Sequence, residues 1–330
     1  MVNIAVLGYG TVGSGVVEVI NTNHKSINKR AGAEINVKYV LDLRDFPGDP
    51  VEKVLVHDYE IIANDPEVDI VVEVMGGIEP AYTFVKRALE SGKSVCTSNK
   101  ALVAKHGPEL MEIASAKNIN FLFEASCGGG IPIIRVINSS LTGDEIDDVT
   151  GILNGTTNYM LYKMSTEGCE FDTVLKEAQQ KGYAEADPTA DVEGYDACRK
   201  IAILSSLAYE RYFDFEDIYT EGITKITPED MEYAAKLGRK CPLSVEGVHK
   251  NGKIPFVVHG LWHVQNLNVA VKYNRCEADR LVDRIDPLKF PDTFKQFWTV
   301  LGSCIQNGVK FRDGAVFHLY DFNFRQKGFL

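Results

Sequence analysis

A glycine-rich turn within the first 15 residues is the strongest constraint on the fold. Val2–Leu7 is an apolar run typical of a buried strand, and an amphipathic segment follows after the sequence Gly8-Tyr9-Gly10-Thr11-Val12-Gly13. In a turn of this spacing Gly8 allows the sharp bend, Gly10 admits a pyrophosphate and Gly13 lets the helix pack on the strand. We expect a dinucleotide to bind here. The predicted contacts are Gly8, Gly10, Thr11, Val12 and Gly13; the alternative is a tight turn without a ligand.

The first 125 residues alternate apolar runs with helical patterns. The runs are continuous in Val, Ile, Leu and Phe, as in strands covered by helices on both faces. This rhythm predicts the α/β class, with a Rossmann-type doubly wound parallel sheet. Strands are expected at 3–7, 35–41, 70–74, 94–97 and 120–123, helices at 12–20, 82–91 and 108–117, and a polar insertion at 22–33.

The pattern changes after Gly130, which predicts a second, mixed α/β domain. We expect a dinucleotide-binding domain at 1–130 and a substrate-binding and dimerisation domain at 131–330, whose C-terminal end packs back on the first. In the second domain we expect strands at 147–153, 243–248 and 255–258, and helices at 157–165, 173–181, 196–207 and 228–237.

Composition limits the partners and the location. The 46 acidic and 35 basic side chains give a net charge of −11, which disfavours nucleic acid and anionic membrane surfaces as partners. Seven scattered cysteines without a Cys-x-x-Cys pair indicate reduced thiols. The N-terminus has neither a basic segment nor a cleavage site, so we expect no signal peptide and a cytoplasmic protein.

Two residues at the end of the second predicted strand bear on the choice of dinucleotide. Asp42 can accept a hydrogen bond from a ribose hydroxyl of NAD, whereas Arg44 can hold the 2′-phosphate of NADP. These readings point in opposite directions, so both dinucleotides remain open.

Acidic residues and a lysine are concentrated at 182–200. Pro188 and Gly194 keep the first part out of regular helix, so Glu185 and Asp191 are expected on a shaped loop. Asp196 follows at a helix N-terminus, and Lys200 shares its helix face at a spacing of four. A lysine beside carboxylates can exchange a proton with a carbonyl or alcohol oxygen. The alternative is an exposed ion pair.

From Ala178 to Lys200 the chain resembles the homoserine dehydrogenase signature, with Gly-Tyr-Ala-x-x-Asp-Pro-x-x-Asp-Val-x-Gly-x-Asp-x-x-x-Lys at 182–200. Further matching segments are the glycine-rich turn, 72–77, 97–101, 124–132 and 154–159. The resemblance covers roughly 1–250; residues 254–330 do not match the pattern, and no regulatory domain is expected.

This resemblance implies NAD(P)-dependent interconversion of L-homoserine and L-aspartate 4-semialdehyde, in threonine and methionine biosynthesis, by a homodimer. Lys200 is implied as the proton donor and acceptor, with Lys100 as a second catalytic lysine that also binds the cofactor. Glu185, Asp191 and Asp196 are implied near the substrate. Arg44 and Gly76 join the expected cofactor contacts.

The resemblance also implies a monovalent cation, sodium, held by the Glu124 carboxylate and by carbonyls of Cys127, Gly129 and Ile131. Two alternatives stay open. Cys127 could be the nucleophile of a semialdehyde dehydrogenase, although no histidine lies near it in sequence. The unmatched C-terminal segment could instead indicate a catalytically impaired relative that binds dinucleotide. His259 and His263 have the spacing of a helical metal pair, but we expect a strand there and no zinc site.

Overall fold

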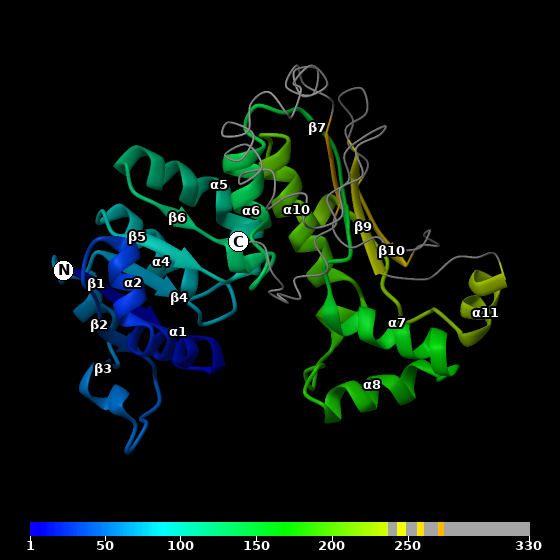
Figure 1. The fold of residues 1–330 in the computed structure, drawn as a ribbon, viewed down its shortest axis with the longest axis horizontal. Coiled ribbons are helices and arrows are strands. Elements are labelled where there is room, and N and C mark those ends of the chain that lie inside the picture. The colour runs from blue at the N-terminus through cyan, green and yellow to red at the C-terminus, as the bar shows by residue number, and fades with distance from the viewer. Residues whose placement is uncertain (237–242, 249–255, 261–269, 274–330) are drawn as a thin grey trace, which may run out of the picture. The chain divides into compact units, whose positions relative to one another are not determined.

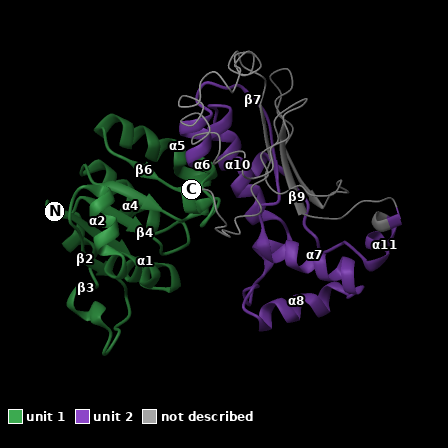
Figure 2. Cartoon of the chain, viewed as in Figure 1, with its two compact units in different colours: residues 1–134 green, residues 135–330 purple. Residues whose placement is uncertain are grey.

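A computed structural model describes residues 1–236, 243–248, 256–260 and 270–273 (Figure 1). The chain divides into two compact units, Met1–Ile134 and Arg135–Leu330 (Figure 2). The segment expected to pack back on the first domain lies largely outside the described residues, as does His263. Within the described residues, every helix is too short or too polar to cross a lipid bilayer.

The first unit contains a six-stranded, fully parallel sheet, which confirms the predicted Rossmann-type fold. The strand order is β3-β2-β1-β4-β5-β6. The order reverses between β1 and β4, so the carboxyl ends of these two strands form the switch point where ligands of such sheets bind. The strands are β1 (Val2–Leu7), β2 (Ile35–Leu41), β3 (Leu55–Val56), β4 (Ile70–Glu73), β5 (Ser94–Thr97) and β6 (Phe121–Leu122).

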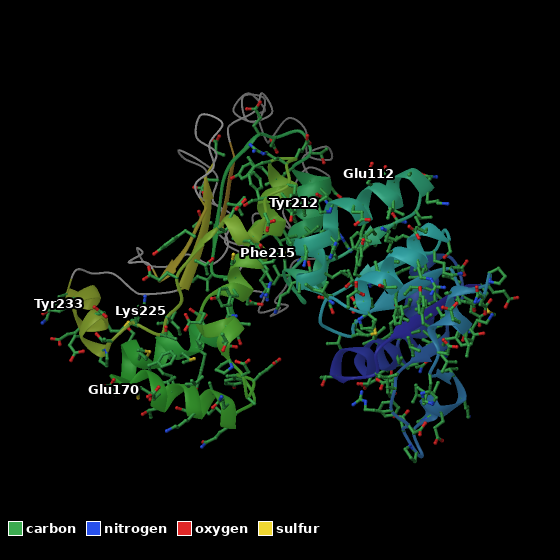
Figure 3. The ribbon with its side chains drawn as sticks, turned by 180° about the vertical axis from the view of Figure 1, so that it is seen from behind. Glu112, Glu170, Tyr212, Phe215, Lys225 and Tyr233 are labelled. Carbon is green, nitrogen blue, oxygen red and sulfur yellow. The ribbon has the colours of Figure 1, made fainter. Side chains whose placement is uncertain are left out.

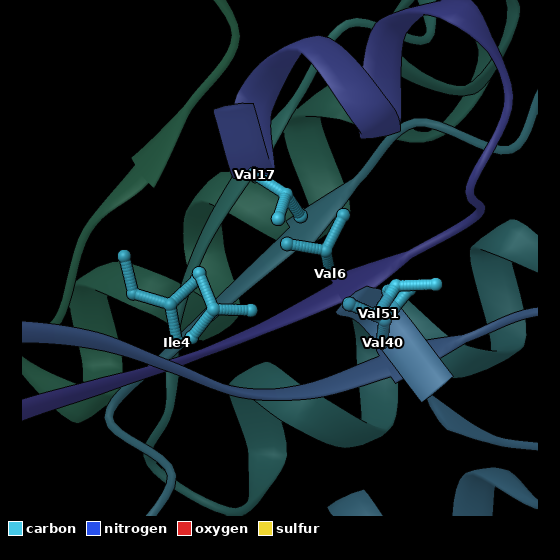
Figure 4. Packing of buried hydrophobic residues seen from close by; sticks show 6 residues of the cluster. Ile4, Val6, Val17, Val40 and Val51 are labelled. Carbon is cyan, nitrogen blue, oxygen red and sulfur yellow. The ribbon is translucent and has the colours of Figure 1, made fainter. Parts of the chain in front are cut away.

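Helices connect these strands. A buried cluster of Ile4, Val6, Val17, Val37, Val40 and Val51 packs the first helix onto the sheet (Figure 4). The helices are α1 (Thr11–Thr22), α2 (His24–Ala31), α3 (Tyr59–Ala63), α4 (Ala81–Glu90) and α5 (Lys100–Lys117), with short 3-10 turns η1 (Pro50–Lys53) and η2 (Glu124–Ser126).

One prediction for this unit was wrong, and one segment without a predicted structure is a helix. The polar insertion at 22–33 forms α2, which buries none of its residues and ends at Gly32 in the left-handed conformation. The helix expected to start at Pro108 starts at Lys100 and contains Pro108. A proline inside a helix removes a backbone hydrogen bond, but buried Leu102 and Leu110, on either side of it, keep α5 packed against the unit.

The second unit contains a mixed five-stranded sheet of order β11-β7-β9-β10-β8, in which only the β8–β10 pair is parallel among the described strands. The strands are β7 (Ile146–Gly151), β8 (Tyr219–Thr220), β9 (Leu243–Val248), β10 (Phe256–Gly260) and β11 (Ala270–Tyr273). His259 lies on β10, a strand as expected.

The helices of the second unit follow the predicted order, with several short additions. A single helical turn, α9, interrupts the segment expected to be loop between Pro188 and Gly194. The helices are α7 (Gly155–Glu167), α8 (Phe171–Gln180), α9 (Thr189–Val192), α10 (Tyr195–Ala208) and α11 (Pro228–Lys236); α6 (Ile133–Arg135), the π-helical turn η3 (Val136–Ser140) and the 3-10 turn η4 (Phe215–Asp217) are shorter.

Candidate active site

The glycine-rich turn has the geometry that a dinucleotide needs. A Cβ on Gly13 would lie 1.9 Å from the Gly8 carbonyl oxygen, so only glycine fits there. A Cβ on Gly10 would meet nothing within 4 Å, so this backbone is open to a ligand. Gly10 is the N-cap residue of α1, so no side chain there accepts the first backbone N–H groups of the helix. Thr11 and Val12 are the first two residues of α1. Uncapped N–H groups at a helix N-terminus favour a bound phosphate.

The loop after β4 lies against this turn. Gly8 has a φ of 100°, and a Cβ there would lie 3.2 Å from Met75 Cα. Gly76 and Gly77 follow with φ of 97° and 75°, a region that side chains with a Cβ rarely adopt. Gly76, predicted to contact the cofactor, therefore lies in a loop that packs beside Gly8.

Asp42 and Arg44 bind each other at the end of β2. Asp42 Oδ1 accepts hydrogen bonds from the Arg44 backbone N–H and Nε, both at 3.0 Å. Its Oδ2 accepts from Tyr9 N–H at 2.8 Å and Arg44 Nη2 at 3.0 Å. The Arg44 guanidinium holds the pKa of the Asp42 carboxyl well below its usual range. The Asp42 side chain is 10% exposed and that of Arg44 is 62% exposed, so Arg44 faces solvent beside the glycine-rich turn.

Lys100 is the first residue of α5. Asn99 caps this helix, because its side-chain oxygen accepts the Leu102 N–H at 3.1 Å. The cap follows β5 directly, so Lys100 lies at the carboxyl end of the sheet, as Gly76 does at the end of β4. The structure thus brings the predicted cofactor contacts of the first unit to one edge of its sheet.

The loop at 124–134 is held by Glu124. Its backbone carbonyl accepts the N–H groups of Cys127 and Gly128, and its Oε1 accepts the Ile134 N–H at 2.7 Å. A Cβ on Gly128 would lie 2.8 Å from the Ile131 carbonyl oxygen, so the chain folds tightly back on itself. Cys127 is 9% exposed, and its Sγ lies 3.8 Å from the Ser126 hydroxyl. Reactive thiols are usually partly exposed, so the burial of Cys127 does not favour a nucleophile.

The second unit brings together three of the residues predicted at 182–200. Lys200 Nζ lies 2.8 Å from Asp196 Oδ2 and 2.8 Å from the Leu153 carbonyl oxygen. The Lys200 side chain is 16% exposed and that of Asp196 is 2% exposed. The prediction that Asp196 opens a helix and shares its face with Lys200 is confirmed. The alternative of an exposed ion pair is wrong.

Asn154 joins the two aspartates. Its Nδ2 donates to Asp191 Oδ1 at 2.7 Å and to Asp196 Oδ2 at 3.0 Å. Its Oδ1 accepts hydrogen bonds from the N–H and the hydroxyl of Thr157, and Asn154 thereby caps α7. In the sequence, Asn154 stands out only as part of the matching segment 154–159. The missed signal was a helix-capping residue directly before Gly155, the first residue of α7.

Asp191 lies on α9, and the loop at 222–223 packs against the backbone of its neighbour Val192. The Val192 carbonyl accepts the Ile223 N–H at 2.8 Å, and a Cβ on Gly222 would lie 2.1 Å from the same oxygen. Glu185, in contrast, is exposed. Gln179 Nε2 donates to its backbone carbonyl at 3.1 Å, and no contact of its carboxylate is found within the described residues. The structure thus groups Asp191, Asp196 and Lys200 but not Glu185.

The neighbouring Arg199 points elsewhere on α10. Its guanidinium carbon lies 5.6 Å from the centre of the Phe215 ring, which Figure 3 labels. The single-residue offset therefore separates the two cations: Arg199 lies over Phe215, whereas Lys200 pairs with Asp196.

Family models match both units of the chain. The model for homoserine dehydrogenase matches residues 132–283, and the model for the homoserine dehydrogenase NAD binding domain matches residues 8–124. A solved S. aureus homoserine dehydrogenase is 38% identical, with a TM-score of 0.72, over 83% of this chain and 69% of that one. The chain belongs to the homoserine dehydrogenase family. The match runs past residue 254, where we expected it to end.

Other members of the homoserine dehydrogenase family agree. The Synechocystis sp. enzyme is 47% identical over 72% of this chain and 55% of its own length, so the chain spans about half of the curated relatives it matches. The structure of the enzyme from Thiobacillus denitrificans is 41% identical, with a TM-score of 0.78, over 83% of this chain and 66% of that one. A hyperthermophilic archaeal member, 27% identical with a TM-score of 0.68 over 83% of this chain and 88% of that one, was solved with NADPH.

Proposed function

We propose that this chain is an NAD(P)-dependent homoserine dehydrogenase that interconverts L-homoserine and L-aspartate 4-semialdehyde. The observation that carries the proposal is the Lys200 ammonium group, held by a buried carboxylate and a backbone carbonyl beside Asn154 and Asp191. Family membership supports the substrate pair. The first unit is then the dinucleotide-binding domain, and the second is the domain for substrate and dimerisation.

Lys200 is proposed to move the proton. In carbonyl reduction its Nζ gives a proton to the oxygen that becomes the hydroxyl of homoserine, and in the reverse direction it takes that proton back. When bound, the dinucleotide supplies or accepts the hydride. Asp196 fixes the direction of the ammonium group by its ion pair at 2.8 Å. Lys100, at the start of α5, is proposed as the second catalytic lysine.

Carboxylates are proposed to bind the substrate. The ammonium group of homoserine needs an anionic partner, and Asp191 and the exposed Glu185 both lie on the segment that leads into α10. Thr156 Oγ1 donates to the Tyr183 carbonyl at 2.8 Å, which ties the start of α7 to the chain two residues before Glu185. This hydrogen bond places the segment that contains Glu185 beside the first turn of α7. The Glu185 side chain is exposed and open to a ligand.

We propose that NADP is preferred over NAD. Both oxygens of Asp42 already accept two hydrogen bonds each, which fills the roughly four acceptor positions of a carboxylate. A ribose hydroxyl of NAD must therefore displace Arg44 from Asp42. The 2′-phosphate of NADP can instead form an ion pair with the exposed Arg44 guanidinium while Arg44 stays bound to Asp42.

Replacement of Arg44 tests this preference. Arg44→Ala should raise the KM for NADP about 10- to 100-fold, the value of a charge-assisted hydrogen bond, and leave the KM for NAD unchanged or lower. Equal changes in both KM values would contradict it.

A sodium ion is proposed at Glu124, Cys127, Gly129 and Ile131. A carboxylate and backbone carbonyls are the oxygen donors that hard cations take, and the tight fold of this loop supports the arrangement. Sodium chloride should then raise the unfolding temperature above that in choline chloride at equal ionic strength. Glu124→Gln should abolish the difference, and an unchanged difference would reject the site.

We further propose a cytoplasmic homodimer that acts in threonine and methionine biosynthesis. The four cysteines in the described part of the chain form no disulfide, which supports a reducing location. Analytical ultracentrifugation of the chain tests the dimer, which should sediment at twice the 36.6 kDa mass of one copy.

Activity is tested with homoserine and each dinucleotide, by the growth of reduced nicotinamide absorbance. Lys200→Ala should lower kcat by about 10²- to 10⁴-fold and leave dinucleotide affinity unchanged. Lys176→Ala, which removes an exposed lysine of α8, is the matched control and should behave as the wild type. A near-normal kcat for Lys200→Ala rejects its role. Dinucleotide binding by calorimetry without turnover in the wild type would indicate the catalytically impaired relative.

A further inference from the structure

A buried carboxylate ends β4 in the first unit. Glu73 is 0% exposed and lies opposite Thr97 in the register of β4 and β5. A buried carboxylate is costly unless it is hydrogen-bonded. Glu73 Oε1 accepts the Met75 N–H at 2.8 Å, and Oε2 accepts the Thr97 hydroxyl at 2.5 Å.

Thr97 links Glu73 to the start of α5 by hydrogen bonds. Its Oγ1 accepts the Asn99 N–H at 2.9 Å, while its own hydrogen goes to Glu73. Asn99 Oδ1 caps α5 at Leu102 N–H, and Nδ2 donates to the Gly77 carbonyl. The bonds therefore close a ring through Glu73, Thr97, Asn99 and the loop 74–77.

The ring joins two functional elements. One is the loop 74–77, whose Met75 packs against Gly8 of the glycine-rich turn and which contains Gly76. The other is the first turn of α5, which begins at Lys100. Thr97 and Asn99 are 1% and 7% exposed, so water competes little for these bonds.

We propose that Glu73, Thr97 and Asn99 are positioning residues that hold the cofactor loop 74–77 and Lys100 in a fixed relation. The inference rests on the proposed function for the role of Lys100, but the loop's contact with Gly8 stands independently. A sheet could join β4 to β5 without these side chains, because the strands already pair through their backbones. The side-chain ring extends that order beyond the ends of the strands, into the loop and the helix cap.

The substitution Asn99→Ser keeps the cap of α5 but removes the hydrogen bond from Asn99 to the loop 74–77. Serine is also a good cap residue, but its side chain has no counterpart of the Asn99 Nδ2, the group that donates to the Gly77 carbonyl. We expect the unfolding temperature to change little, the dissociation constant for NADP or NAD to rise about 3- to 10-fold, the value of one net hydrogen bond, and kcat to fall. Asp58→Ser, which changes the cap of α3, is the matched control and should leave affinity and kcat unchanged.

A second pair guards against misfolding of the Asn99 variant. Thr97→Val removes the hydroxyl that links Glu73 to Asn99 and should weaken dinucleotide affinity, whereas Thr97→Ser keeps the hydroxyl and should restore it. Normal affinity and kcat in both Asn99→Ser and Thr97→Val would overturn the proposal, as would losses explained by stability alone. The affinity measurement needs no turnover: a wild type inactive with homoserine would reject the proposed function but leave this comparison intact.

Discussion

Replacing Asn154 by serine removes the amide that bridges two carboxylates. Asn154 is 5% exposed, and its Nδ2 donates to Asp191 and Asp196 while its Oδ1 caps α7. A serine hydroxyl can still cap the helix, but it does not reach both aspartates. Asn154→Ser therefore tests the bridge with the cap retained.

The expected loss follows from the two bonds. A hydrogen bond to a charged group contributes about 1.5–3 kcal/mol, so two bonds set a ceiling of about 3–6 kcal/mol. Asp191 is half-buried, so water replaces part of its bond, and Asp196 keeps its ion pair with Lys200. We expect Asn154→Ser to lower the free energy of unfolding of the second unit by about 2–4 kcal/mol. Asn154→Ala should cost about 1 kcal/mol more, because it also removes the cap.

Urea unfolding followed by circular dichroism measures this change, with the two units fitted as separate transitions where both are seen. The KM for homoserine should rise in parallel, because the carboxylates lose their common donor. Asn138→Ser makes the same chemical change at an exposed position and should stay within about 0.5 kcal/mol of the wild type. A loss in Asn154→Ser no larger than this, with an unchanged KM, would refute the reasoning.

Two further predictions concern other parts of the molecule. Gly13→Ala should abolish dinucleotide binding measured by calorimetry, because its Cβ would lie 1.9 Å from a backbone oxygen, whereas Gly15→Ala, whose Cβ meets nothing within 4 Å, should bind normally. Lys163, with Lys181 and Tyr159, lowers the pKa of Glu177 from 4.5 to about 2. The stabilisation from Glu177 should therefore be complete above pH 4.5 and be lost as the pH falls toward 2. Urea midpoints should accordingly fall less on acidification in Glu177→Gln, and an equal fall would contradict the assignment.

Elements with a strong local pattern were predicted closely. β2 and β5 match the expected 35–41 and 94–97 to the residue. Helix starts were predicted less well. α5 and α7 begin eight and two residues earlier than expected, because the capping roles of Asn99 and Asn154 were not recognised. Asn99 and Asn154 also link distant groups by hydrogen bonds: Asn99 joins Thr97 to Gly77, and Asn154 joins Asp191 to Asp196.

Other features have a weak local signal or none. α2 is polar and buries none of its residues, so no hydrophobic period marks it. Glu73 does carry a signal that could have been used: a carboxylate within an apolar strand must find donors. One donor, the Met75 N–H, is local, but the other is the Thr97 hydroxyl on β5, 24 residues further along the chain.

Sequence by itself determined the features that depend on neighbours along the chain. The glycine spacing specifies the turn before α1, and the spacing of four puts Asp196 and Lys200 on one helix face, because backbone geometry repeats over a few residues. Only the tertiary structure decided that Asn154 reaches carboxylates 37 and 42 residues away. Such bonds arise when packing brings distant segments within about 3 Å, a distance that no local period encodes.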